Sequence, residues 1–166
     1  MPNDDGGFDS RLQRAIQRGE HARAAAGKAA AAKQLSAEEQ KSVFSRTRLQ
    51  LIERIEECLK KLADHFPGFS FQPVMRDDAW GASVSRDDLA VQRGEGPKTL
   101  YSRLEMSITP LGSAGIIELV AKGTIRNREA FHRRNYQRLE QVDVETFNEL
   151  IDLWVLEYAE MFSASA

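Results

Sequence analysis

The sequence predicts an α+β fold. We expect a two-layer sandwich, with a four- or five-stranded antiparallel meander covered on one face by a long N-terminal helix and a C-terminal helix. Apolar residues recur every three or four positions in residues 36–66 and 143–162, but at every second position through much of residues 69–125. The connections within 69–125 are too short for crossover helices, so neighbouring strands must run antiparallel.

The first 35 of the 166 residues differ in composition from the rest. Phe8 is their one aromatic residue and Ile16 their one β-branched residue, while eight of the eleven residues from Ala22 to Ala32 are alanine. Alanine buries little apolar surface, so this part adds little to a core. We therefore predict a flexible alanine-rich tail over residues 1–35 and a single α+β domain over residues 36–166.

A narrow apolar stripe lies within this tail. Phe8, Leu12 and Ile16 follow one another at intervals of four, close to the capping candidates Asp9 and Ser10. The spacing favours a short helix that we expect to end at Gly19. Two interpretations stay open: the tail is disordered, or its short helix folds onto a partner with the alanine-rich stretch as a tether.

The first long helix of the domain is predicted from residue 36. Ser36 and Glu39 have the spacing of a capping box, and Phe66-Pro67-Gly68 is expected to end the helix. The stripe covers fewer than three heptads, so we expect it to pack against a sheet rather than in a coiled coil. Its members are Ile52, Ile55, Leu59, Leu62 and Phe66.

Alternation then predicts strands near residues 69–73, 80–85, 89–91, 100–108 and 117–125. We interpret Arg86-Asp87-Asp88 as a tight turn, residues 94–97 as a loop and residues 110–115 as a turn. Trp80 is expected on the buried face of its strand. The polar face is predicted to hold Arg103, Glu105, Glu118 and Lys122, within reach of cross-strand pairing.

Residues 127–141 fit neither period, so we expect an irregular or partly extended connection there. Asp143 is then predicted to cap the last helix. The broad apolar face of this helix includes Trp154, which we expect in the core. The other members of the face are Val144, Phe147, Leu150, Ile151, Tyr158 and Phe162.

Charge is distributed unevenly along the chain. The net charge is −2, yet residues 126–138 hold five arginines, and seven acidic residues but no Lys or Arg follow Arg138. Arginines interleaved with aromatic residues suit phosphate contact and base stacking. The competing interpretation is that these arginines pair with acidic residues such as Glu140, Glu145 or Glu149. The candidate binding residues are Arg126, Arg128, Phe131, His132, Arg133, Arg134, Tyr136 and Arg138.

Several other kinds of site are not expected. His21, His65 and His132 lie far apart in sequence and no metal-ligand motif is present, so we expect neither a metal nor a cofactor. Gly94-Glu95-Gly96 places a carboxylate where a phosphate would bind, so we interpret it as a hairpin loop. Cys58 lies on the apolar helix face, where burial raises the pKa of a thiol and makes it inert.

The sequence therefore favours a small non-enzymatic binding or adaptor module whose partner is another protein, including a second copy in a homodimer. The alternative is nucleic-acid or polyanion binding through residues 126–138, although a sequence pI near 6.0 argues against a broad basic footprint. An enzyme would need a pocket around residues such as Tyr101, Arg103 and Glu105. The single cysteine and the lack of an apolar run long enough for a bilayer favour the cytoplasm and no membrane partner.

Overall fold

The computed structural model describes residues 7–32 and 35–165, with the side chains of 29–32 left out of the description. The chain divides into two compact units, Met1–Ser36 and Ala37–Ala166. The described part of the first unit is a single helix, α1 (Phe8–Ala32). The second unit is the α+β domain.

Helix α1 is longer than the sequence pattern indicated. The expected end at Gly19 is wrong, because the helix continues through Gly19 and Gly27 to Ala32. Each glycine costs roughly 1 kcal/mol of helix propensity, but the surrounding alanines have the highest propensity of any residue. A helix therefore takes the place of the irregular tail, while the flexibility of this segment stays a prediction.

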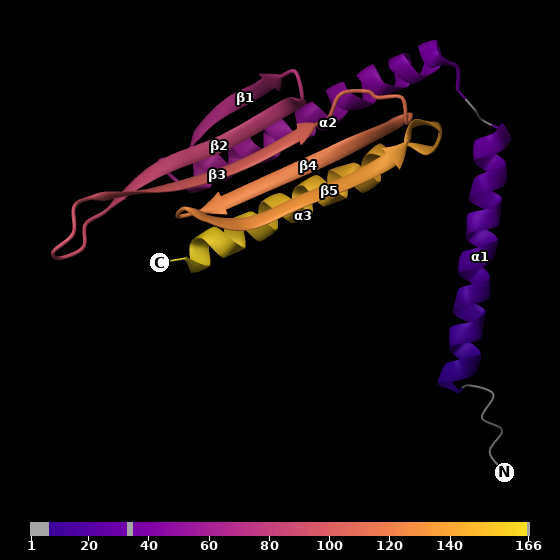
Figure 1. The fold of residues 1–166 in the computed structure, drawn as a ribbon, viewed down its shortest axis with the longest axis horizontal. Helices are drawn as coiled ribbons and strands as arrows, with labels where there is room; N and C mark the ends of the chain where they lie inside the picture. The colour runs from indigo at the N-terminus through magenta and orange to yellow at the C-terminus, as the bar shows by residue number, and fades with distance from the viewer. Residues whose placement is uncertain (1–6, 33–34, 166) are drawn as a thin grey trace. The chain divides into compact units, whose positions relative to one another are not determined.

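The domain confirms the predicted α+β sandwich (Figure 1). Its sheet has five antiparallel strands in the order β1-β2-β3-β4-β5, which is a meander. Helices α2 (Ala37–His65) and α3 (Val144–Ala164) cover one face of this sheet. The remaining elements are β1 (Ser70–Arg76), β2 (Ala79–Ala90), β3 (Lys98–Ile108), β4 (Ile116–Ile125), β5 (Arg128–Arg138) and the 3-10 helix η1 (Leu139–Gln141).

The core lies between the sheet and these two helices. Leu51, Ile55 and Leu59 of α2 are fully buried, as are Phe147 and Ile151 of α3. Fully burying a side chain of this size contributes about 1.5–3 kcal/mol each. The predicted apolar stripes therefore form one shared core.

The buried tyrosine of α3 also anchors that helix to the sheet. The Tyr158 hydroxyl donates a hydrogen bond of 2.7 Å to the carbonyl oxygen of Thr124, the polar partner that a buried tyrosine needs. Burial also raises the pKa of Tyr158 well above its ordinary value. The side chain therefore stays a neutral donor in this position.

Helix ends agree with the sequence prediction. Helix α2 ends at His65, and Gly68 follows with φ +106°, a left-handed conformation that glycine adopts without strain. Helix α3 begins after Asp143, whose carboxylate accepts a hydrogen bond of 3.1 Å from the backbone N–H of Glu145. Asp143 is therefore the predicted N-cap.

The predicted turn at Arg86-Asp87-Asp88 is wrong, because β2 continues to Ala90. Residues two apart on a strand share a face, so Arg86 and Asp88 pair at 2.5 Å along the strand. The Arg86 guanidinium also lies 5.5 Å from the ring centre of Phe69 and 5.4 Å from that of Phe162. These contacts stabilise Arg86 and Asp88 within β2, where a turn was expected.

The irregular connection expected at 127–141 is also wrong, since most of it is the edge strand β5. Arg126 and Asn127 form the preceding turn with φ +48° and +68°. A register shift between Gly123 and Thr124 marks a bulge in the β4–β5 pairing. The bulge interrupts the alternation of apolar and polar residues, and an edge strand exposes polar side chains on both faces. The sequence of residues 127–141 therefore lacks the two-residue period of a strand.

The two tryptophans differ in environment. Trp154 is 5% exposed, which confirms its place in the core. The prediction of a core position for Trp80 is wrong, because this side chain is 37% exposed. The guanidinium of Arg48 lies 3.7 Å above its ring, a cation–π contact that covers Trp80 at the rim of the sheet.

Strands β2 and β3 approach so closely at Gly81 that no side chain fits. A Cβ atom there would overlap the carbonyl oxygen of Met106. We predict that Gly81→Ala lowers the free energy of unfolding by about 1–3 kcal/mol because the strands must separate. Urea denaturation measures the difference.

The matched control is Gly112→Ala, since a Cβ at Gly112 meets nothing within 4 Å. We expect that control to change the free energy of unfolding by less than about 0.5 kcal/mol. Equal losses at the two positions would contradict the close approach at Gly81.

Candidate functional site

A groove opens to solvent along the seam between α2 and α3, and we call it the interhelical groove. Its volume is about 510 Å³. The buried side chains of Leu62 and Val155 form part of its lining, and Leu156, which is 67% exposed, stands at its edge. The other lining residues are Arg54, Cys58, Lys61, His65, Phe66, Asp152 and Ala159. The lining is mainly apolar, with charged groups from both helices.

The local sequence of each helix explains this groove. Leu59 and Leu62 of α2 and Ile151 and Tyr158 of α3 are buried in the domain. Residues about a quarter turn around each helix, including Cys58 and Leu156, then border the seam on the solvent side. The groove is thus a consequence of placing two amphipathic helices on one face of a sheet.

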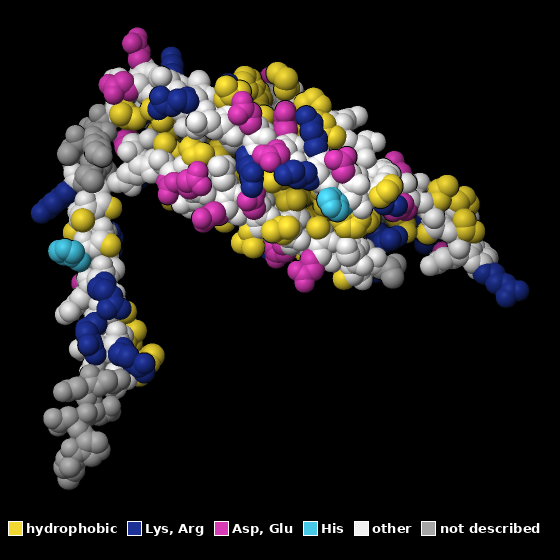
Figure 2. Space-filling model, turned by 180° about the vertical axis from the view of Figure 1, so that it is seen from behind, with side chains coloured by type: hydrophobic (Ala, Val, Ile, Leu, Met, Phe, Trp, Pro, Cys, Tyr) yellow, Lys and Arg dark blue, Asp and Glu magenta, His cyan; other side chains and the backbone are white. Residues whose placement is uncertain are grey.

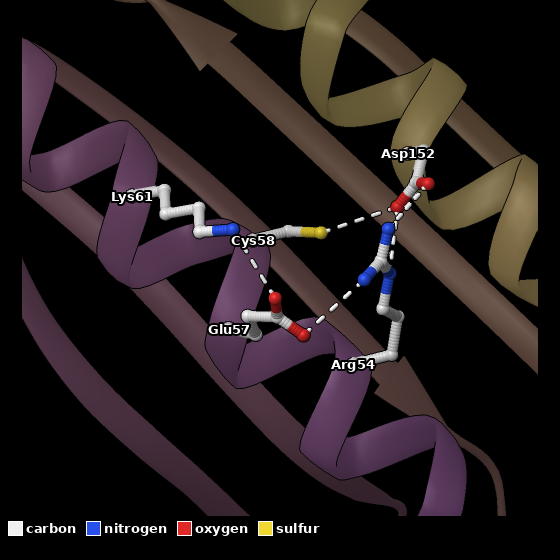
Figure 3. Close-up of polar contacts among 5 residues, drawn as sticks. All are labelled: Arg54, Glu57, Cys58, Lys61 and Asp152. Carbon is white, nitrogen blue, oxygen red and sulfur yellow. Dashed lines mark hydrogen bonds and ion pairs between the residues drawn. The ribbon is translucent and has the colours of Figure 1, made fainter.

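Charged side chains bridge the two helices at one end of this groove (Figure 3). The Arg54 guanidinium donates two hydrogen bonds to Asp152, at 2.8 and 2.5 Å. It also donates to Glu57 at 3.2 Å, and Glu57 in turn pairs with Lys61 at 3.2 Å. A two-point arginine–carboxylate contact fixes geometry better than a lysine does, so this pair sets the spacing of α2 and α3.

Cys58 belongs to the same polar cluster. Its thiol donates a hydrogen bond of 3.3 Å to Asp152. Burial of the thiol is the main cause that raises the pKa of Cys58 to about 11, and the hydrogen bond to Asp152 is the second cause. The hydrogen bonds from Arg54 conversely hold the pKa of Asp152 below its ordinary value. The direction of this shift is the one expected from the sequence, although Cys58 is only half-buried, and such a thiol is protonated near neutral pH.

The surface beside the groove is acidic on the α3 side. Helix α3 contains five acidic residues and no basic residue. Glu149 and Glu160 are exposed, and they lie seven residues before and four residues after Leu156, on the same helix face. Figure 2, which views the side opposite to Figure 1, shows hydrophobic side chains reaching the surface between acidic and basic ones. A ligand in the groove would therefore meet an apolar surface with negative charge on the α3 side and the paired Arg54 and Lys61 on the α2 side.

The structure does not bring the predicted arginine segment together as one patch. Arg133 pairs with Glu157 of α3, and Arg134 pairs with Glu118 of β4 at 3.1 Å. Arg126 lies near the end of α3, where it donates a hydrogen bond of 3.3 Å to the Ser165 hydroxyl.

The other members of this segment are also divided. Phe131 is 8% exposed and packs edge-on against Tyr158 in the core. His132 and Tyr136 are exposed and oppose Lys122 and Glu118 of β4. Arg128 and Arg138 are exposed at the two ends of β5. Alternation along the strand places Phe131 and Arg133 on the face toward α3, while His132, Arg134, Tyr136 and Arg138 share the opposite, exposed face.

A second polar cluster lies on the sheet face away from the helices. Glu105 opposes Ser83 and Lys122 on the neighbouring strands. Its carboxylate accepts hydrogen bonds from Arg76 at 2.7 and 3.1 Å and from Arg103 at 2.7 Å. These contacts, led by Arg76, hold the pKa of Glu105 below its ordinary value. The predicted polar face is present, but its carboxylate is buried and fully paired.

Comparison with known proteins adds no family: no family model, curated protein or solved structure matches the chain. Among residues 7–32 and 35–165, no group of three or more His, Cys, Asp or Glu is placed to hold a metal ion. No helix in the described part of the chain is both long enough and apolar enough to cross a membrane.

The sequence contained only part of the signal for the interhelical groove. Cys58, Leu62 and Val155 could be assigned to helix faces from their spacing. Arg54 and Asp152 are 98 residues apart, so no local pattern pairs them. The clearest available signal was Leu156, an apolar residue that falls outside the main apolar face of the last helix.

We predict that Asp152→Asn lowers the pKa of Cys58, because a negative charge beside the thiolate is removed while Arg54 stays. The pH dependence of iodoacetamide alkylation measures this change. The matched control is Asp64→Asn, which changes an exposed carboxylate on α2, the helix that holds Cys58. This control is expected to leave the alkylation profile unchanged. An unchanged profile for Asp152→Asn would contradict the Cys58–Asp152 contact.

We also predict that Glu105→Gln lowers the free energy of unfolding at pH 7 by about 2 kcal/mol, because charge-assisted hydrogen bonds from two arginines are lost. The folded-state pKa of Glu105 is lowered, so its contribution is present above the unfolded pKa of about 4.3 and is lost as pH falls through the folded value. Urea denaturation across pH should show the wild type and the variant converging in acid.

The control for this prediction is Glu57→Gln, whose side chain is 49% exposed in its pair with Lys61. We expect this control to cost less than about 0.5 kcal/mol, as for other exposed pairs. A gap between wild type and Glu105→Gln that persists unchanged below the folded pKa would contradict the ionised, paired carboxylate.

Proposed function

We propose that the domain is a protein-binding module that accepts a basic amphipathic helix in the interhelical groove. The observation that carries this proposal is a mainly apolar groove that is open to solvent, with Leu156 exposed at its edge. Laying the apolar face of a helix into such a groove is a common mode of peptide recognition. A solvent-exposed apolar groove is also characteristic of sites that bind other proteins.

The dimensions of the groove suit a short helix. Its lining on α2 extends from Arg54 to His65, which is about 17 Å along the helix axis at 1.5 Å per residue. Three apolar residues spaced four apart on a partner helix cover about 12 Å by the same rise. One such stripe therefore fits within the groove.

Charge defines the chemistry of the partner further. Arg54 and Lys61, the basic residues of α2 in the lining, are already paired with Asp152 and Glu57. The exposed glutamates Glu149 and Glu160 of α3 lie on the same helix face as Leu156. A partner with Lys or Arg beside its apolar stripe would be attracted to this border and oriented by it.

Polyanion binding through residues 126–138 stays the second hypothesis. It is less well supported because Arg133 and Arg134 are paired with carboxylates and Phe131 is in the core. Within residues 126–138, all of which the structure describes, Arg128 and Arg138 at the ends of β5 are the exposed arginines without a carboxylate partner. Binding to DNA at low salt that weakens steeply as salt is added would favour this hypothesis instead.

The proposed function predicts binding of a designed probe to the full chain. The probe is a fluorescein-labelled peptide of lysine, alanine and leucine with leucine at every fourth position, and fluorescence anisotropy measures its affinity. We expect a dissociation constant of about 10 µM, weakened at least about tenfold by Leu156→Asp, because apolar burial is lost and a negative charge enters the apolar lining.

The matched control is Leu89→Asp, which changes a residue that is 75% exposed on β2, outside the groove. This variant is expected to bind the probe as the wild type does. A probe with the same composition in scrambled order tests for simple charge attraction. Equal binding of the scrambled probe, or unchanged binding by Leu156→Asp, would contradict the proposal.

A further inference from the structure

Helix α1 has the features that the interhelical groove would require of a partner. Phe8, Leu12 and Ile16 are 68%, 45% and 51% exposed, and their spacing of four places them on one face of the helix. These three exposed residues form an apolar stripe, and we call it the α1 stripe. An apolar stripe on a helix normally packs against another surface.

The charge of α1 is opposite to that of α3. Helix α1 carries Arg11, Arg14, Arg18, Arg23 and Lys28 against Asp9 and Glu20, whereas α3 has only acidic residues. Arg11 and Arg18 are seven residues apart, so they flank the stripe along one side. The basic flank of α1 thus complements the acidic border of the groove.

We propose that the groove of one copy of this protein binds the α1 stripe of a second copy. This inference rests on the proposed function and names its partner. Phe8, Leu12 and Ile16 would occupy the apolar lining around Leu62, Val155 and Leu156. Arg11 and Arg18 would lie toward the acidic border formed by Glu149 and Glu160.

The rest of α1 serves as a spacer for the stripe. Residues 17–32 continue the same helix and hold the stripe about 24 Å along the axis from Ala32. Residues 17–28 are exposed and rich in alanine, so this part is a spacer without an apolar face of its own. Each copy has one stripe and one groove, so two copies satisfy both sites and close a two-fold pair.

The test is the mass of the full chain in solution, measured by light scattering over a range of protein concentrations. We expect a concentration-dependent dimer. The double variant Leu12→Gln/Ile16→Gln should weaken dimerisation about a hundredfold or more, because each of the two contacts in the pair loses two buried apolar side chains. Leu156→Asp should also weaken it about a hundredfold or more, because the tenfold loss expected at one groove applies at both grooves of the pair. Added salt should weaken dimerisation of the unaltered chain because it screens the arginine–glutamate attraction.

Matched controls keep these variants interpretable. Ala25→Gln lies on α1 away from the stripe, and Leu89→Asp lies outside the groove, so both should dimerise as the wild type does. Glutamine has a high helix propensity, so Leu12→Gln/Ile16→Gln should retain the helix content measured by circular dichroism.

A mixing experiment tests exchange between copies directly. The Leu12→Gln/Ile16→Gln variant keeps an intact groove, and the Leu156→Asp variant keeps an intact stripe. Their mixture should form one-to-one heterodimers, held by the one intact contact, at concentrations where each variant alone is a monomer. A wild-type chain that is monomeric at every concentration, including one whose stripe binds within its own chain, would overturn the inference. Dimers that persist in all variants would overturn it as well.

The two proposals fail in different ways. If the chain is monomeric but still binds the designed leucine–lysine probe in a Leu156-dependent manner, the inference about a second copy is wrong and the proposed function stands. If the probe does not bind to the monomeric chain of the Leu12→Gln/Ile16→Gln variant, whose groove is intact and unoccupied by a second copy, the proposed function is wrong.

Discussion

Two amphipathic helices share one face of a single sheet, and the rest of the domain depends on this constraint. Leu59 of α2 and Ile151 of α3 are both fully buried. The two helices are joined across their seam by the hydrogen bonds between Arg54 and Asp152. Because each helix buries its apolar stripe in the domain, the seam itself faces solvent. The interhelical groove follows from that arrangement rather than from a special loop or insertion.

The uneven distribution of charge along the chain bears on which ligand the interhelical groove would favour. The chain has a net charge of −2, which conceals a basic α1 and an acidic α3. In the α+β domain, arginines of β5 that resemble a binding patch in the sequence are partly neutralised, as the Arg133–Glu157 and Arg134–Glu118 pairs show. Beside Leu156, the exposed charges of α3 are acidic, whereas Arg54 and Lys61 of α2 are paired with Asp152 and Glu57. The electrostatic features therefore favour a basic peptide at the groove over a polyanion at β5.

Sequence periodicity predicted most of the architecture because each helix and strand has one buried face. Ile55 and Leu59 at helical spacing, and Leu104 and Met106 at strand spacing, are all buried as the pattern indicates. The prediction failed where tertiary contacts override local pattern. Arg86 stays within β2 because aromatic rings and Asp88 hold its charge. The edge strand β5 was missed because it carries polar residues on both faces.

The candidate site was less accessible to sequence reasoning than the fold. Its central pair, Arg54 and Asp152, is brought together only when the sheet places α2 beside α3. Its apolar lining uses residues such as Leu62, which already belong to the core pattern, so the sequence does not distinguish a groove from an ordinary core. The α1 stripe was evident from sequence spacing, because Phe8, Leu12 and Ile16 recur at intervals of four.

The most direct test of the groove as a helix-binding site is to map the designed leucine–lysine probe on the protein by backbone amide chemical shifts. We expect the largest shifts in residues 54–65 of α2 and 152–160 of α3, with little change in β5. Shifts concentrated in residues 126–138, or spread evenly over the acidic surface, would contradict the account.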